Sequence, residues 1–352
     1  MASSSQSRCL VKGSINIDEF FALPHIVRPG ETISSTSLTK TAGGKGANQS
    51  YAVSQASGKV DLDGYIGKDG EWVRDYLVNG GVGDKRLITL DEELTGRAII
   101  QSSSDGENSI VLHAGANYYI PSSSSSSSSS DIPDLDGYSH ILLQNEIPLS
   151  ITRSYLIESN KKGLISIFNP SPMLSDQDLK QFPWKSLNWL IVNEVELNDL
   201  LIAFSTPSST NQNSLQNQNN QNKIKILEDL ELNELIEISS NNITTLNTNQ
   251  YFSKEINIIC TLGSKGILYF TPSSSSKDVK HLPASKLKNP LRDTTGAGDC
   301  FAGYFVAGLM RNEHLEDVLK TCLTACAICV ENQGAMESIP SRDEVISRQK
   351  EQ

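Results

Sequence analysis

The chain has 352 residues, 38% of them hydrophobic and 20% charged, and its formal net charge is −11. This acidic balance argues against a nucleic acid as partner, because a phosphate backbone is bound by clustered positive charge. The serine-rich first nine residues do not resemble a signal peptide, and no apolar run approaches the roughly twenty residues of a membrane span, so we expect no membrane partner. The six cysteines come without a secretory context, which favours reduced thiols in the cytoplasm, with the nucleus as a further location.

Two segments have the composition of loop insertions. Residues 122–130 are all serine, and residues 205–222 are almost entirely Ser, Thr, Asn and Gln. Such tracts bury too little apolar surface to offset the entropy of ordering them, which predicts disordered loops. An acidic helical pattern over 224–238 and a weaker polar stretch over 239–250 follow the second tract. The rest of the chain alternates strand and helix patterns, so we expect one α/β domain over 1–352, with a mostly parallel central sheet flanked by helices.

The predicted strands of the main sheet are apolar runs rich in β-branched residues and bounded by turn signals. In chain order they cover residues 9–11, 140–143, 164–168, 189–192 and 256–262. Residues 97–112 have a different pattern, a hairpin with apolar runs on both sides of Asp105-Gly106. Together with residues 32–41, which lack a core pattern, this hairpin could build a small antiparallel sheet beside the main domain. The pattern alone favours a surface hairpin over a lid that covers a ligand.

The strongest candidate site is the glycine-rich segment DTTGAGDCFAG, from Asp293 to Gly303. An apolar face with helical spacing follows it, so a helix is predicted to begin here. Gly296 and Gly298 allow close approach of the backbone, and amides that converge at the helix N-terminus would form an anion hole for a phosphoryl group. Asp299 would lie at the mouth of this hole and accept a hydroxyl proton. The alternative is a carboxylate that only caps the helix.

A second glycine-rich segment, TAGGKGANQ, covers residues 41–49. Three glycines in four residues again predict close backbone approach, ahead of a helix that starts near Ala47. The segment is not a Walker A loop, because no Ser or Thr follows Lys45, and it lacks the GxGxxG pattern of dinucleotide-binding folds. On its own it is a weak signal, and a glycine-rich turn before a helix would explain it equally well.

With further motifs in the same order, these two segments resemble the PfkB family of carbohydrate kinases, and its ribokinases in particular, over nearly the whole chain. The matching segments are GSINID at 13–18, PGET at 29–32, GGKGAN at 43–48, HAGAN at 113–117, QNE at 144–146, NPSP at 169–172, NEVE at 193–196, TLGSKG at 261–266 and DTTGAGD at 293–299. The resemblance implies a ribokinase-like fold and ATP-dependent phosphorylation of D-ribose at O5, which gives ribose 5-phosphate and ADP.

The resemblance also implies roles for individual residues, with Asp299 as the catalytic base and the amides of Gly296–Asp299 as the anion hole. The residues that would bind ribose are Asn16, Asp18, Gly44, Lys45, Gly46, Ala47, Asn48, Glu146 and Asp299. Those that would bind ATP are Asn193, Thr261, Leu262, Gly263, Ser264, Lys265, Gly266, Gly298, Asp299 and Leu323, while Glu196 would hold Mg²⁺ through water. An activating K⁺ would lie beside the anion hole, between Asp293, Thr295, Cys329, Asn332, Gly334 and Ser338.

By the same resemblance, residues of about 15–42 and 96–112 become a lid over the sugar, which would also join two copies of the chain in a homodimer. Three features depart from the family pattern: Val192 where proline is usual, Leu323 where a polar residue is common near the adenine, and the polar tract that follows Glu196. Two alternatives stay open, another sugar or nucleoside kinase of the family and a non-catalytic sugar-binding regulator. Such a regulator would be expected to lack the base or the anion-hole glycines.

Overall fold

The structure is a computed structural model that describes residues 7–104, 107–121, 133–205, 230–273 and 278–351. The predicted serine loop at 122–130, almost all of the predicted loop at 205–222 and the turn signal Asp105-Gly106 lie outside the described residues. Within the described parts of the chain, no helix combines the length and apolar character of a transmembrane span.

A nine-stranded sheet forms the centre of the fold, in the order β13-β12-β11-β10-β9-β8-β1-β4-β5. Neighbouring strands from β5 to β11 pair in parallel, whereas β12 and β13 pair antiparallel. The strands β1 and β8 are buried along their whole length, as expected when helices cover both faces of a sheet. The predicted mostly parallel sheet is thus confirmed. Its strands are β1 (Cys9–Lys12), β4 (Val60–Gly67), β5 (Gly83–Leu90), β8 (His140–Leu143), β9 (Ile165–Phe168), β10 (Trp189–Asn193), β11 (Asn257–Thr261), β12 (Ile267–Phe270) and β13 (Lys280–Leu282).

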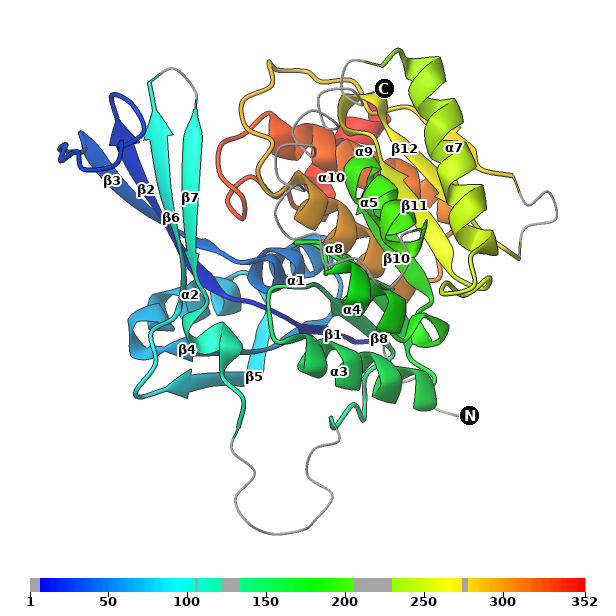
Figure 1. Ribbon diagram of the computed structural model, residues 1–352, viewed down its shortest axis with the longest axis horizontal. Coiled ribbons are helices and arrows are strands. Elements are labelled where there is room, and N and C mark those ends of the chain that lie inside the picture. Colours follow the sequence, from blue (N-terminus) through cyan, green and yellow to red (C-terminus); the bar gives the residue numbers. More distant parts are fainter. Residues whose placement is uncertain (1–6, 105–106, 122–132, 206–229, 274–277, 352) are drawn as a thin grey trace, which may run out of the picture.

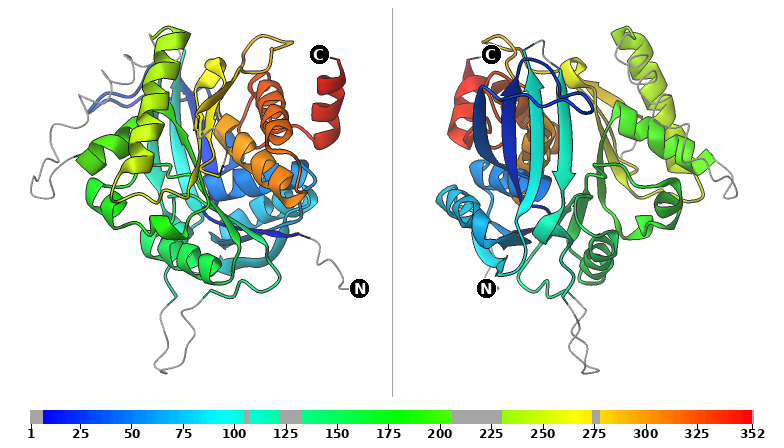
Figure 2. Two further views of the ribbon diagram at one scale, coloured as in Figure 1. Left: turned by 90° about the vertical axis from the view of Figure 1, so that its right-hand side faces the viewer. Right: turned by 60° about the vertical axis from the view of Figure 1, so that its left-hand side comes forward.

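Helices cover both faces of this sheet (Figures 1 and 2). One face carries α1 (Lys45–Gln55), α2 (Glu71–Asn79), α8 (Ala297–Met310), α9 (Leu315–Val330) and α10 (Arg342–Lys350). The other face carries α3 (Leu149–Lys161), α4 (Asp176–Gln181), α5 (Glu194–Ser205) and α7 (Leu232–Thr248). Single helical turns are η1 (Lys68–Gly70), η2 (Gly115–Tyr118), η3 (Trp184–Ser186) and η4 (Gly263–Lys265).

The helix α7 continues past residue 238, where the acidic helical pattern of the sequence ended, and reaches Thr248 within the stretch at 239–250 that was noted only as weakly polar. Leu235, Ser239, Ile243 and Leu246 bury one face of the helix. The serine in this stripe weakens the apolar pattern in the sequence, although its spacing is helical.

A smaller four-stranded sheet projects to one side of the main sheet, in the order β3-β2-β6-β7 (Figure 1). The predicted small antiparallel sheet is therefore present, and the predicted hairpin supplies β6 and β7. One pairing, between β2 and β6, is parallel, whereas β2–β3 and β6–β7 are antiparallel. Its strands are β2 (Asn16–Leu23), β3 (Ser37–Gly43), β6 (Gly96–Ser103) and β7 (Asn108–His113).

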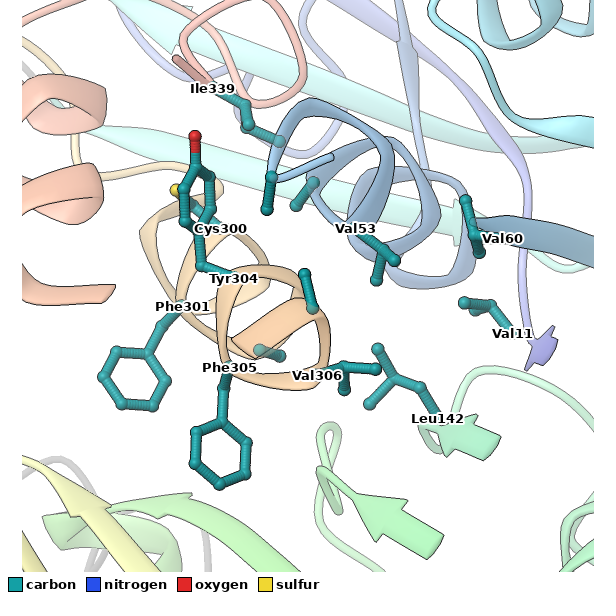
Figure 3. Close-up of a cluster of buried hydrophobic side chains, with 14 of the residues drawn as sticks. Val11, Val53, Val60, Leu142, Cys300, Phe301, Tyr304, Phe305, Val306 and Ile339 are labelled. Atoms are coloured by element: carbon teal, nitrogen blue, oxygen red, sulfur yellow. The ribbon is translucent and has the colours of Figure 1, made fainter. Parts of the chain in front are cut away.

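The helix α8 packs closely against α1 within the buried core (Figure 3). Gly303 makes this approach possible: a Cβ atom at this position would lie 2.3 Å from the Cβ of Ala52 and 2.7 Å from the backbone nitrogen of Val53. Apolar side chains such as Val306 and Phe305 continue the packing toward the sheet. The first turns of the two helices are thereby held against each other, and both carry residues of the candidate site.

Candidate active site

The strand order reverses direction between β1 and β8, and the candidate site begins there. From β1 the chain continues to β4 and β5 on one side, and β8 to β11 later extend the sheet on the other side. Ligand sites of such sheets lie at the carboxyl ends of the strands near this point. Ser14 follows β1, and its Oγ donates to Oε2 of Glu146, which follows β8, at 2.5 Å. The backbone nitrogen of Lys45 donates to the same oxygen at 2.9 Å, so the Glu146 carboxylate is held in a fixed orientation.

The segment 41–49 joins β3 to α1, which begins at Lys45, two residues earlier than the sequence suggested. Gly44 has a φ of 87°, a conformation that favours glycine. A Cβ atom on Gly43 would lie 2.1 Å from Oδ2 of Asp18. Gly43 is therefore needed because the Asp18 side chain of β2 lies directly against this backbone, whereas a Cβ atom on Gly44 or Gly46 would meet backbone atoms of residues 13–16.

Asp18 is a buried carboxyl group with unusual protonation. Burial, and then the negative charges of Glu146, Glu337 and Asp299, raise its pKa to about 7. Its Oδ1 atom is buried and has no hydrogen-bond partner among the described residues. An oxygen in this state is costly unless a donor reaches it, so the position suits a ligand hydroxyl group.

Asp299 lies in the first turn of α8, and its carboxylate turns toward α1. Its Oδ2 accepts a hydrogen bond from Nδ2 of Asn48 at 3.0 Å, and its Oδ1 accepts one from Nε2 of Gln49 at 2.8 Å. The N-cap of α8 is Gly296, with no side-chain cap. Asp299 is therefore not a simple helix cap, which was the alternative explanation of this residue. Oδ1 of Asn48 is buried without a partner in the described part of the chain, as Oδ1 of Asp18 is.

Lys45 supplies positive charge to this cluster of carboxylates. Burial lowers the pKa of its ammonium group, but the negative charges of Asp299, Glu146 and Glu196 outweigh this effect and raise the pKa above its ordinary value. The side chain is therefore charged at neutral pH. Its charge acts on Asp299 and Glu146, which were predicted to bind the sugar, and on Glu196, which was predicted to lie near the phosphates.

The sequence predicted an anion hole at the N-terminal end of α8. Gly296 adopts the left-handed conformation with a φ of 78°, and a Cβ atom there would lie 2.8 Å from the backbone of Ala335. A Cβ atom on Gly298 would meet nothing within 4 Å, so the backbone at this position faces open space. Amides in a first helical turn have no acceptor within the helix and carry the positive end of its dipole.

The predicted ATP residues follow β10 and β11. Asn193 pairs with Thr261 in the sheet register, so the ends of the two strands lie side by side. Asn193 and Glu196 exchange hydrogen bonds between side chain and backbone, at 3.0 and 2.7 Å, which fixes the start of α5. Burial raises the pKa of Glu196, although hydrogen bonds and the charge of Lys45 oppose this shift.

The turn η4 consists of Gly263, Ser264 and Lys265 and is followed by Gly266, whose φ is 97°. Two of the predicted ATP residues have apolar side chains that pack in different hydrophobic clusters. Leu262 packs with the α5 and α7 side of the sheet and Leu323 with the α8 and α9 side.

The residues predicted to hold a monovalent cation come from two loops that lie together. Oδ1 of Asp293 accepts from the amide of Thr295, and Oδ2 accepts from the amide of Gly334, both at 2.9 Å. Burial raises the pKa of Asp293, but these hydrogen bonds lower it below its ordinary value. Sγ of Cys329 and Oγ of Ser338 are 3.0 Å apart.

Several residues of the site received no role from the sequence. Asn117 donates from Nδ2 to Oδ1 of Asn16 at 2.8 Å and to the Ile15 carbonyl at 3.1 Å, and it accepts from the Ile15 amide at 2.8 Å. Asn117 lies in the HAGAN segment and Gln49 in the TAGGKGANQ segment. Their position in these motifs was therefore the sequence signal that could have identified them as site residues. Glu337 had none, because only the fold brings its loop near Asp18.

A buried carboxylate beside a glycine-rich helix N-terminus, at the carboxyl ends of a parallel sheet, is the arrangement of a phosphotransferase that activates a hydroxyl group. The chain belongs to the pfkB family of carbohydrate kinases, whose family model matches residues 6–226 and 204–342. The resemblance noted in the sequence is therefore confirmed.

Individual relatives agree with this assignment. The crystal structure of ribokinase from Cryptococcus neoformans var. grubii serotype A in complex with ADP is 56% identical, with a TM-score of 0.85, and the match covers 97% of this chain and 99% of that chain. Ribokinase from Arabidopsis thaliana, solved with ribose and ATP, is 26% identical, with a TM-score of 0.75 and coverage of 97% and 98%. The ribokinase of Haemophilus influenzae is 29% identical over 96% of both chains.

Proposed function

We propose that this protein transfers the γ-phosphoryl group of ATP to O5 of D-ribose and releases ribose 5-phosphate and ADP. The observation that supports the proposal most is the placement of Asp299, which accepts from two side chains of α1 and stands beside the open backbone of Gly298. The similar ribokinases of Cryptococcus and Arabidopsis, solved with ADP and with ribose and ATP, support the same substrates.

The sugar would lie between α1 and β2, where buried acceptors can bind hydroxyl donors. Oδ1 of Asp18 and Oδ1 of Asn48 are buried and lack partners among the described residues, and each could accept from one hydroxyl group. Glu146 would contribute its oriented carboxylate, and Asn16 its amide group. The backbone of 44–47 would line the pocket. These contacts hold C5-OH toward Asp299.

The reaction needs positioning and charge stabilisation more than covalent help from the protein. Asp299 accepts the proton of C5-OH as O5 forms its bond to the γ-phosphorus atom, and the bond from that atom to the bridging oxygen of ADP breaks. The amides of Gly296–Asp299 receive the negative charge that spreads over the equatorial oxygens. Lys45 offsets part of the negative charge of the surrounding carboxylates.

ATP would extend from the anion hole along the ends of β10 and β11, past Asn193 and the turn at 261–266. Mg²⁺ fits this site, because the Glu196 carboxylate is half-buried and held near the predicted phosphates, and oxygen ligands suit this ion. The contact between Glu196 and the ion would run through water. Bound with ATP, Mg²⁺ would neutralise charge on the phosphate oxygens.

K⁺ would lie between the two loops that Asp293 joins. The ligand atoms available there are carbonyl and carboxylate oxygens, which suit a hard monovalent cation. The two loops are held together because the amides of Thr295 and Gly334 both donate to the Asp293 carboxylate. The side chain of Asn332 donates to the carbonyl of Ile328 at 2.9 Å, so this residue would contribute its backbone. A cation here would add positive potential beside the anion hole.

The smaller sheet would act as the lid over the sugar and as the contact between two copies of the chain. Its outer strands expose Leu38, Ile110, Val111 and Leu112, with between 49% and 63% of each residue accessible. Apolar side chains on an exposed strand favour burial against a partner. All six cysteines are free thiols, which suits the reducing cytoplasm and would equally suit the nucleus.

Steady-state kinetics with ribose, fructose and adenosine as acceptors test the proposal, with ribose expected to give the highest kcat/KM. For Asp299→Asn we expect kcat to fall by about 10²- to 10⁴-fold, the usual contribution of a general base, while ribose still binds in calorimetry. A preference for fructose or adenosine would favour another kinase of the family. A folded protein that binds ribose without turnover would favour a sugar-binding regulator. A kcat for Asp299→Asn within about threefold of the wild type would exclude Asp299 as the base.

A further inference from the structure

Gln49 is a polar residue that the proposed reaction does not use, although it is completely buried. It lies on α1, and its Nε2 donates to Oδ1 of Asp299 at 2.8 Å. Its other end is also occupied, because Oε1 accepts from Nε2 of Gln144 at 2.6 Å. Gln144 follows β8 and is 1% exposed. Two buried amides therefore connect the switch point of the sheet to the carboxylate of Asp299.

The direction of this chain of hydrogen bonds is fixed by charge. An ionised carboxylate only accepts, so Gln49 must present its NH₂ group to Asp299 and its carbonyl oxygen to Gln144. Gln144 must then present its own NH₂ group. Reversing one amide would bring two acceptors or two donors together in a buried place, which is costly. The arrangement has one stable orientation.

The two hydrogen bonds to Asp299 differ in their surroundings. Oδ1 of Asn48 is buried and has no partner among the described residues, so this side chain is expected to contact the sugar as well. Gln49 has both ends of its amide engaged and no exposure, so ligand binding leaves it in place. We propose that Gln49, held by Gln144, is the positioning residue that directs the lone pair of Asp299 toward the acceptor hydroxyl. This inference rests on the proposed function, because it assigns Asp299 as the base.

The variant Gln49→Met tests the inference, because methionine has nearly the same length and lacks the donor. We expect kcat to fall by about 10- to 100-fold, the effect of losing one hydrogen bond to a charged group, and the KM for ribose to stay within about twofold. A residue that only supports the fold would change stability without this division between kcat and KM. Gln144→Met should lower kcat less, by about 3- to 10-fold. The double variant should be no worse than Gln49→Met, since both residues act through one contact.

Gln55→Met is the matched control. Gln55 lies on the same helix, and its Nε2 donates to the Gly80 carbonyl at 3.2 Å, away from Asp299. We expect this variant to keep wild-type kinetics.

Wild-type kcat in folded Gln49→Met would overturn the inference, and an equal loss in Gln55→Met would assign the effect to α1 in general. If Gln49→Met does not fold, Gln144→Met decides: an unchanged kcat refutes the role of the pair, and a lower kcat at constant KM supports it. A wild-type protein without ribose kinase activity would instead refute the proposed function.

Discussion

Replacing Gly303 with alanine should separate α1 from α8 and thereby weaken catalysis. The new Cβ atom would lie 2.3 Å from the Cβ of Ala52 and 2.7 Å from the backbone nitrogen of Val53. Backbone atoms in a packed helix cannot turn aside as a long side chain can, so the helices must move apart. Gly303 lies one helical turn after Asp299, and Ala52 one turn after Asn48, so the shift reaches the site directly.

The size of the effect follows from these distances. An ordinary carbon contact of about 3.5 Å requires a shift of about 1 Å. The hydrogen bonds from Asn48 and Gln49 to Asp299, now 3.0 and 2.8 Å, would then lengthen to about 4 Å, which is outside the bonding range. Overpacking costs about 1–3 kcal/mol, and the better helix propensity of alanine offsets about 1 kcal/mol of this. A misplacement of about 1 Å can cost about 10²-fold in rate, so we expect kcat to fall by about 10- to 100-fold.

Thermal unfolding and steady-state kinetics on the same preparation measure both effects. Gly308→Ala is the control, because its new Cβ would meet Cγ1 of Val318 on α9 at 2.5 Å and leave the contact with α1 unchanged. This control should lose stability and keep its kcat. Two results would refute the reasoning: a Gly303→Ala enzyme with wild-type kcat, or an equal loss of kcat in Gly308→Ala.

Three further predictions concern the sugar side and the cation. Because the pKa of Asp18 is about 7 without ligand and ribose hydroxyls bind the ionised form, the KM for ribose should rise below pH 7 by up to about tenfold per unit. Asp18→Asn should give a high KM that does not vary with pH, and a constant wild-type KM from pH 8 to 6 would contradict this. Asn117→Leu removes three hydrogen bonds at Ile15 and Asn16, so calorimetry should show weaker ribose binding and unfolding should occur at a lower Tm. K⁺ should activate more than Na⁺ at equal ionic strength, and Asp293→Ala, which frees both loops, should abolish the difference.

The parts of the fold that sequence could predict are those whose cause is local. The buried strands are short apolar runs because helices cover both faces of the sheet, and this pattern shows in the sequence. The glycines at 296 and 44 stand out because their left-handed backbone excludes most other residues. The segments that surround them are therefore recognisable as ligand-binding loops from their residues alone.

Residues whose role depends on distant packing could not be predicted in this way. Asn48 and Gln49 are adjacent residues on one helix, and both donate to Asp299. This residue lies 251 and 250 positions later in the chain, so nothing in the local sequence indicates the two contacts. The role of Asn117 is likewise defined by contacts with a segment more than 100 residues away. The extent of α7 was missed because Ser239 occupies a buried position that usually holds an apolar residue.

The pocket must admit a polyanion although carboxylates dominate it. Asp18, Glu146, Glu196 and Asp299 lie near one another, with the ammonium group of Lys45 among them. We infer that phosphate binding therefore relies on the backbone amides and the dipole of α8, which carries about half a positive charge at its N-terminus. On the sugar side the excess negative charge favours hydroxyl donors and repels phosphate. Burial, with the help of this charge, raises the pKa of Asp18 to about 7, so a sugar that donates to this carboxylate displaces a proton as it binds. The same charges thus direct each substrate to its own side of Asp299.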